Sequence, residues 1–184
     1  MKKSFLLFAA LLVFASYAAA TDCNFDSFSG SGTVPDGYCG ITWGGVWTYY
    51  DGTQFPYTPF SPPERVYTPA SGAGEYTFTL DSPAVFQGAY FSGYDFATVY
   101  FNLYDSSHTL LWTSASLSPT DVPTWLASGY SGAVSIVGVY SADNDYYIMD
   151  DVTYGTSVPE PGSIALFATG ALGALGVIRR RLAK

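Results

Sequence analysis

Apolar and polar residues alternate along most of the central part of the chain, and this alternation constrains the fold more than any other feature. In residues 75–80, for example, Tyr76, Phe78 and Leu80 fall on one side of an extended chain. A period of two is typical of strands with one buried face, and no helical period appears between residues 21 and 157. We expect about eight short strands, which predict an all-β antiparallel sandwich or jelly roll.

Clusters of Gly, Pro, Asp and Ser separate the strands. The clearest expected strands are residues 75–80, 84–91, 98–104, 109–113, 134–140 and 146–154. We expect residues 81–83 to end the first of these strands before the second begins, and residues 105–107 to form a hairpin turn. Val99, Phe101 and Leu103 should share a buried face.

Residues 48–70 interrupt the pattern. The stretch holds five prolines and few periodic residues, so we expect a long loop on the surface. Tyr49, Tyr50 and Tyr57 lie in it and are the tyrosines that we expect to be exposed.

The first 20 residues have the features of a secretory signal peptide. Lys2 and Lys3 precede an apolar run, and three alanines end at Ala20. The run is too short to span a bilayer of about 30 Å comfortably. We therefore expect cleavage after Ala20 and an exported domain in residues 21–157; an uncleaved anchor is the alternative.

The end of the chain, residues 158–184, has three parts in a fixed order. They are the step Val158, Pro159, Glu160 and Pro161, an apolar run without charge from residue 164 to 178, and the cluster Arg179, Arg180 and Arg181. A buried helix of a soluble domain would show a polar face, which this run lacks. We expect a short transmembrane helix with the arginines on the cytoplasmic side.

Charge is distributed unevenly between these segments. Six of the seven basic residues lie in the two terminal segments, which leaves Arg65 alone in residues 21–157 against 14 acidic residues, a net charge of −13. Such a surface repels phosphate backbones, so the composition excludes nucleic-acid binding. Divalent cations and neutral glycans are the partners that this charge permits.

Cys23 and Cys39 are the only cysteines. In an exported protein such a pair is typical of a disulfide, which would contribute about 3 kcal/mol by closing a short loop. Two free buried thiols are the alternative.

Within the segment 21–157, few side chains suggest catalysis or metal binding. His108 is the only histidine and falls in an expected hairpin turn, and no nucleophile-elbow or zinc-protease motif is present. Abundant carboxylates leave a glycoside hydrolase open, but we expect neither an enzyme nor a cofactor. Candidates for calcium ligands are Asp143, Asp145 and Asp150. Because Asp150 and Asp151 are neighbours in an expected strand, they should point to opposite faces.

Aromatic residues make up 18% of the chain, which suggests a carbohydrate-binding function. The flat face of a sugar ring stacks on an aromatic ring. The four tryptophans that could form such a platform are Trp43, Trp47, Trp112 and Trp125. Core packing is the alternative use of each.

The three-part tail resembles the PEP-CTERM sorting signal of Gram-negative bacteria. The resemblance implies export, removal of the leader by signal peptidase, a membrane-anchored intermediate in the inner membrane, and processing by an exosortase near the Pro-Glu-Pro step. Residues 35–43 and 147–154 are also similar to the opening and the final strand of exported domains that precede such tails. These domains imply a surface or biofilm-matrix role, associated with exopolysaccharide.

We therefore expect a structural or adhesive protein of the cell surface or extracellular matrix. A carbohydrate-binding module is the alternative, and a carboxylate-based glycoside hydrolase is a third hypothesis.

Overall fold

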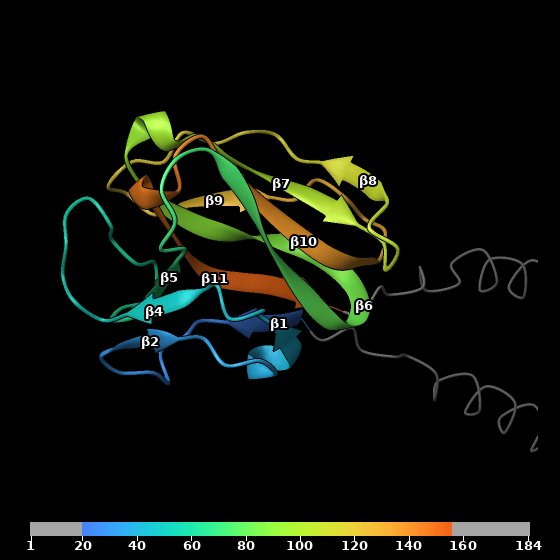
Figure 1. The fold of residues 1–184 in the computed structure, drawn as a ribbon, viewed down its shortest axis with the longest axis horizontal. Helices are drawn as coiled ribbons and strands as arrows, with labels where there is room; N and C mark the ends of the chain where they lie inside the picture. The colour runs from blue at the N-terminus through green and yellow to red at the C-terminus, as the bar shows by residue number, and fades with distance from the viewer. Residues whose placement is uncertain (1–19, 156–184) are drawn as a thin grey trace, which may run out of the picture. The chain divides into compact units, whose positions relative to one another are not determined.

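The computed structural model describes residues 20–155, which fold into eleven strands and three short 3-10 helices (Figure 1). The strands are β1 (Ala20–Cys23), β2 (Ser31–Thr33), β3 (Ile41–Thr42), β4 (Thr48–Tyr50), β5 (Arg65–Tyr67), β6 (Gly74–Gly93), β7 (Val99–Tyr104), β8 (Leu110–Thr113), β9 (Thr124–Ala127), β10 (Val134–Ser141) and β11 (Tyr147–Gly155). The helices are η2 (Tyr38–Gly40), η3 (Asp95–Ala97) and η4 (Asn144–Tyr146). The expected all-β, antiparallel class is confirmed.

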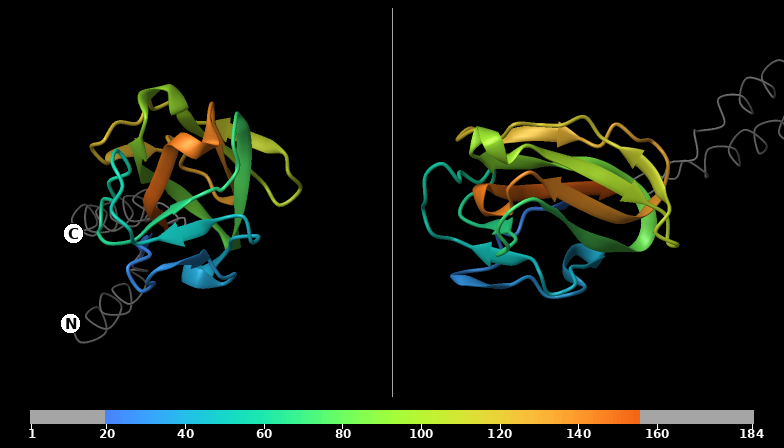
Figure 2. Two further views of the ribbon diagram at one scale, coloured as in Figure 1. Left: turned by 60° about the vertical axis from the view of Figure 1, so that its left-hand side comes forward. Right: turned by 45° about the horizontal axis from the view of Figure 1, so that its top comes forward.

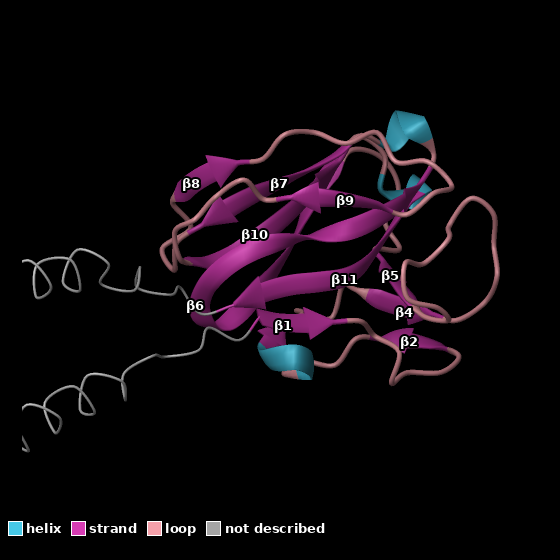
Figure 3. Cartoon of the chain, turned by 180° about the vertical axis from the view of Figure 1, so that it is seen from behind, coloured by secondary structure: helices cyan, strands magenta, loops and turns pink. Residues whose placement is uncertain are grey.

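The long strand β6 belongs to both halves of one antiparallel sheet. Its first half pairs with β10 and β3, and β10 continues through β7 to β8. Its second half pairs with β9 on one side and β11 on the other, and β11 continues to β1 and, through β5 and β4, to β2. We call these the first and second half-sheets. Figure 3 gives the view from behind, in which β9, β11 and β1 of the second half-sheet can be followed.

The core lies between the two half-sheets and is rich in aromatic rings. Phe101 of β7 contacts Phe86 and Phe91 of the second half of β6, with ring centroids 4.8 and 5.6 Å apart. Val99, Phe101 and Leu103 are all buried, as the alternation predicted. Each such side chain contributes about 1.5–3 kcal/mol when it is buried. The packing of Phe101 on Phe86 and Phe91 therefore stabilises the face-to-face contact of the two half-sheets, as in a β-sandwich.

The expected break at residues 81–83 is wrong. The chain stays extended from Gly74 to Gly93 and passes from one half-sheet to the other. Asp81, Ser82 and Pro83 are exposed there, and the pairing with β10 shifts between Thr79 and Ala84. A proline is tolerated in a strand where its missing N–H has no ladder partner, so this turn-like sequence bends the strand without ending it.

The expected loop at 48–70 is only partly correct, because it contains β4 and β5. These strands form an antiparallel pair that closes the segment 51–64 (Figure 2). Arg65 and Val66 are buried, and Val66 pairs with Met149 of β11. Three-residue strands among prolines carry too little alternation to be recognised from the sequence.

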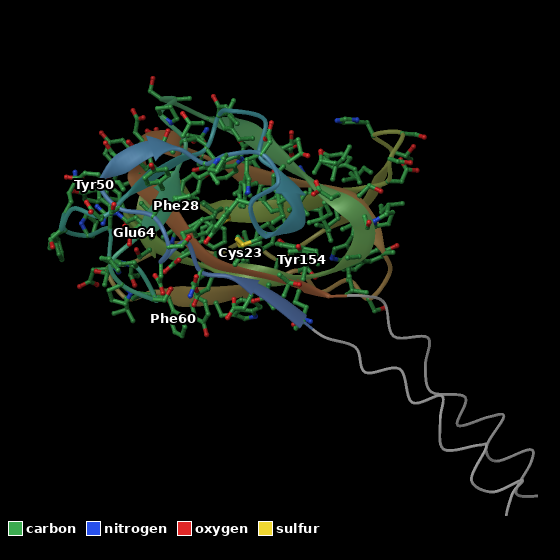
Figure 4. The ribbon with its side chains drawn as sticks, turned by 90° about the horizontal axis from the view of Figure 1, so that it is seen from below. Cys23, Phe28, Tyr50, Phe60, Glu64 and Tyr154 are labelled. Carbon is green, nitrogen blue, oxygen red and sulfur yellow. A yellow bond between two sulfur atoms is a disulfide. The ribbon has the colours of Figure 1, made fainter. Side chains whose placement is uncertain are left out.

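A disulfide joins Cys23 at the end of β1 to Cys39 in η2, with 5.8 Å between the Cα atoms. Figure 4 shows it beside Tyr154, whose hydroxyl donates to the carbonyl oxygen of Cys39. His108 is exposed in the hairpin between β7 and β8, where its N–H donates to the Asp105 carbonyl. No helix within residues 20–155 is long and apolar enough to cross a membrane. The expected signal peptide and C-terminal helix lie outside the described residues.

Candidate functional site

A groove of about 460 Å³ opens on the second half-sheet, and we call it the aromatic groove. Five segments contribute to it: β1, the loop before β5, the second half of β6, β9 and β11. The residues that line it are Asp22, Phe60, Gln87, Tyr90, Trp125, Asp151 and Thr153. Aromatic faces and polar groups therefore meet in one place, as in many ligand sites.

Three aromatic rings form a continuous surface in the groove. Phe60 lies parallel to Tyr90 with 3.6 Å between ring centroids, and the Trp125 ring meets Tyr90 at 5.1 Å and 61°. Phe60 is 48% exposed and Trp125 is 37% exposed. Tyr90 and Trp125 are direct partners in the β6–β9 ladder, so the sheet itself fixes their spacing.

A glycine two residues before Tyr90 brings β9 close. Gly88 has φ +150°, and a Cβ at this position would lie 2.1 Å from the Leu126 carbonyl oxygen and 2.8 Å from the Trp125 ring. Only glycine tolerates such an approach of another backbone. The position of Trp125 in the groove therefore depends on this residue.

Ser61 fastens the loop that carries Phe60 to β11. Its N–H donates to Asp150 Oδ2 at 2.8 Å, and its hydroxyl donates to Asp151 Oδ1 at 2.7 Å. The expectation that Asp150 and Asp151 point to opposite faces is wrong here. Asp151 has φ +46°, and the β11–β6 register shifts between Asp150 and Thr153. Such a bulge redirects a side chain, so both carboxyls reach Ser61.

Burial changes the acidity of this cluster. It raises the pKa of Asp150 to about 8, although N–H groups of Ser61 and Asp151 donate to the Asp150 carboxyl. Burial also raises the pKa of Asp151, and the charges of Asp22 and Asp26 raise it further. Desolvation favours the neutral form of an acid. The groove is therefore less negative than its sequence indicates.

The three calcium candidates are not brought together. Asp143 Oδ1 accepts the N–H of Gly72, and Asp150 is held by Ser61. Asp145 contributes its carbonyl oxygen to the Tyr57 hydroxyl. Within residues 20–155, no group of three or more His, Cys, Asp or Glu side chains could hold a metal ion.

The four candidate tryptophans have different positions. Trp43 and Trp47 are buried in the core, whereas Trp112 and Trp125 are exposed, and only Trp125 lines the groove. Tyr49, Tyr50 and Tyr57 are all partly buried rather than fully exposed. None of these three tyrosines is among the residues that line the groove.

Sequence reasoning missed Phe60 and Tyr90. The alternation along β6 offered a signal for Tyr90, because its neighbour Phe91 is in the core and Tyr90 must face outward. The position of Phe60 depends on the contacts between Ser61 and β11, for which the sequence gives no signal.

The sorting residues Val158, Pro159, Glu160 and Pro161, and the cluster Arg179, Arg180 and Arg181, lie outside the described residues. Their sequence nevertheless decides the nature of the tail. Residues 157–181 match the family model of the PEP-CTERM protein-sorting motif. The PEP-CTERM motif indicates an exported protein that is processed at its C-terminus and implies exosortase-dependent processing.

Several solved structures are similar to this chain with its PEP-CTERM motif. Two mutant forms of a family 29 carbohydrate-binding module, CBM29-2, are 12% identical, with a TM-score of 0.45 over 77% of this chain and 93% or 94% of theirs. A DUF4465 family protein from Bacteroides caccae is 13% identical, with a TM-score of 0.45 over 77% of this chain and 94% of its own. No curated protein matches this chain in sequence.

Proposed function

We propose that this chain is an exported, non-enzymatic polysaccharide-binding protein that acts as a structural or adhesive component of the cell surface or extracellular matrix. The aromatic groove is its contact site. The observation that carries the proposal is the surface of Phe60, Tyr90 and Trp125, held by strand pairing and by the Ser61 contacts. The apolar face of a sugar ring stacks on such a surface.

Polar groups beside the rings supply the hydrogen bonds that a sugar needs. Asp22 Oδ1 accepts the Thr153 hydroxyl at 3.3 Å, and Asp151 Oδ1 accepts the Ser61 hydroxyl. The second oxygen of each carboxyl accepts no hydrogen bond from the described residues, and Gln87 adds an exposed amide. Each Oδ2 can accept a sugar hydroxyl, which would orient the ring on the aromatic surface.

Binding of a neutral polysaccharide tests this function. We expect the purified full chain to be retarded in gels that contain an exopolysaccharide or a neutral glucan or mannan. Trp125→Ala should weaken binding about tenfold, which is the loss expected when one stacking ring is removed. Trp112→Ala is the matched control, because Trp112 is 44% exposed but lies outside the groove. Equal loss in both variants, or release of reducing ends by the wild-type protein, would contradict the proposal.

The route to the surface is a second part of the proposal. Signal peptidase removes residues 1–20, the C-terminal helix holds an intermediate in the inner membrane, and the exosortase cleaves near Pro159, Glu160 and Pro161. Mass spectrometry of the native protein tests both cleavages. A mature chain that still ends at Lys184 would argue against exosortase processing.

A further inference from the structure

A second pocket, of about 330 Å³, lies beside the closed end of the 51–64 loop and shares no residue with the aromatic groove. We call it the Arg65 pocket. Tyr50, Gln54, Tyr57, Arg65, Thr68 and Tyr147 are among its lining residues. Figure 4 shows Tyr50 and Phe60 at the same end of the domain. Its volume is within the usual range for small-ligand pockets, about 300–1,000 Å³.

Arg65 is the one basic residue of residues 21–157, and it is only 2% exposed. Its guanidinium lies 5.0 Å from the centre of the Tyr50 ring. Within the described part of the chain, the guanidinium makes no hydrogen bond and no ion pair. A buried charge is costly unless it is paired. The charges of Asp51 and Asp150 favour the charged form of Arg65 from a distance, but neither carboxylate contacts the guanidinium, so its N–H groups still need an acceptor.

The neighbouring carboxylate does not supply that acceptor. Glu64 is fully buried, and neither of its carboxyl oxygens has a hydrogen-bond partner within residues 20–155. Glu64 precedes β5, and its carboxylate forms no ion pair with the Arg65 guanidinium within the described residues. The one cation of the domain is therefore not neutralised by its adjacent acid.

Two further groups of the same pocket lack partners. The hydroxyls of Thr68 and Tyr147 are buried, and neither has a hydrogen-bond partner of good geometry among the described residues, although the Thr68 hydroxyl lies close enough to Tyr147 to oppose the rise in pKa that burial causes. Buried hydroxyls are usually satisfied. The pocket therefore combines a planar donor fork, two hydroxyls, the Gln54 amide and one acid, Asp145, and its donors suit a ligand rich in oxygen acceptors.

We infer that the Arg65 pocket binds the carboxylate of an acidic sugar in the polysaccharide that the aromatic groove holds. Arginine pairs with carboxylates through two parallel hydrogen bonds, and the tyrosines beside it offer faces for the sugar ring. This inference rests on the proposed function for the polymer, whereas the pocket itself can be tested with a single sugar.

The charge of the domain narrows the class of polymer further. A body with a net charge of −13 repels a chain that carries a carboxylate on every sugar. A single carboxylate at Arg65 is compatible with that field. The fitting ligand is a heteropolysaccharide in which neutral sugars separate the acidic ones.

Calorimetry on the full chain tests the inference with two matched pairs of probes. Gellan, in which neutral sugars separate the glucuronates, is compared with carboxyl-reduced gellan, and glucuronate is compared with glucose. The wild-type protein should prefer the acidic member of each pair. Arg65→Met should lower affinity for the acidic probes about ten- to a hundredfold and leave binding of carboxyl-reduced gellan unchanged. Arg65→Lys should retain part of the affinity.

Further variants separate this pocket from the groove. Thr68→Val keeps shape and charge and should lower glucuronate affinity a few-fold, even if Arg65→Met fails to fold. Trp125→Ala should weaken binding of carboxyl-reduced gellan and leave glucuronate binding intact. A wild-type protein that binds glucuronate but neither form of gellan would contradict the proposed groove and leave the Arg65 pocket standing. Equal affinity for glucuronate and glucose would overturn the inference. Equal binding of a glutamate peptide and glucuronate would overturn the assignment to a sugar.

Discussion

The hydroxyl of Ser61 donates to Asp151 Oδ1 at 2.7 Å, across 90 residues of sequence. This contact joins the proline-rich loop to the bulge of β11. Because Phe60 precedes Ser61 and stacks on Tyr90, this hydrogen bond and the one from the Ser61 N–H to Asp150 link the buried acidic cluster to the exposed aromatic surface. The stability of the loop and the shape of the groove are therefore coupled.

The variant Ser61→Ala tests whether the contact between the proline-rich loop and β11 stabilises the domain and shapes the groove. The variant loses the hydrogen bond to Asp151 but keeps the backbone N–H that donates to Asp150. Hydrogen bonds to charged groups contribute about 1.5–3 kcal/mol. We therefore expect the free energy of unfolding, measured with denaturant, to fall by that amount, and we expect the groove to bind polysaccharide less tightly. Ser82→Ala is the control, because Ser82 is exposed at the bend of β6. Unchanged stability in Ser61→Ala would show that the contact is not needed.

The buried carboxyl of Asp150 predicts an inverse dependence of stability on pH. Its pKa is about 8 in the folded chain and 3.8 is its ordinary value, so between these values the folded state binds more protons than the unfolded state. The free energy of unfolding should then fall as the pH rises from 4 to 8. With about 1.4 kcal/mol per pKa unit, we expect a fall of about 2–5 kcal/mol.

Asp150→Asn checks this pH dependence, because the amide can still accept the Ser61 N–H but cannot ionise. The variant should match the wild type near pH 4, exceed it at pH 8, and keep a residual slope from Asp151 and Glu64, whose pKa values burial also raises. Thermal unfolding measured across this range is sufficient. A wild-type stability that increases with pH through the same window would refute the assignment.

Reduction of the disulfide should destabilise the start of the domain. Cys23 and Cys39 are 16 residues apart, and closing a loop of this length contributes about 3 kcal/mol in the chain-entropy model. We expect a lower unfolding temperature in the presence of a reductant and in the double variant with serine at both positions. Reductant added to the double variant is the control and should have no effect. An identical unfolding temperature with and without reductant in the wild type would exclude the contribution.

The sequence pattern predicted the central strands well because their alternation continues without interruption. Val99, Phe101 and Leu103 are buried together because they share the face of β7 that packs against the second half of β6, where Phe101 contacts two phenylalanine rings. The pattern failed at Asp81 and Pro83, where polar residues mark a bend between half-sheets rather than an end. Local propensity cannot distinguish these cases, since the difference depends on where the next partner strand lies.

The site was less predictable than the fold. Trp125 was among four candidates, and its exposure follows from the β6–β9 pairing, which no short-range pattern reports. The opposite-face prediction for Asp150 and Asp151 assumed an ideal strand, and the left-handed conformation of Asp151 overturned it. The unusual isolation of Arg65 was visible in composition, but its burial in a pocket was not.

Gly88→Ala should damage the groove more than its small size suggests. The added Cβ would lie 2.1 Å from the Leu126 carbonyl oxygen, so β9 must move away and carry Trp125 with it. We expect a loss of about 2–4 kcal/mol in unfolding free energy, from the clash and the strained φ together, and a shifted tryptophan fluorescence. Gly44→Ala is the matched control, because Gly44 has φ +70° but no atom within 4 Å of the added Cβ, so it reports backbone strain alone, about 1 kcal/mol. Equal losses in the two variants would mean that close approach of β9 does not position Trp125.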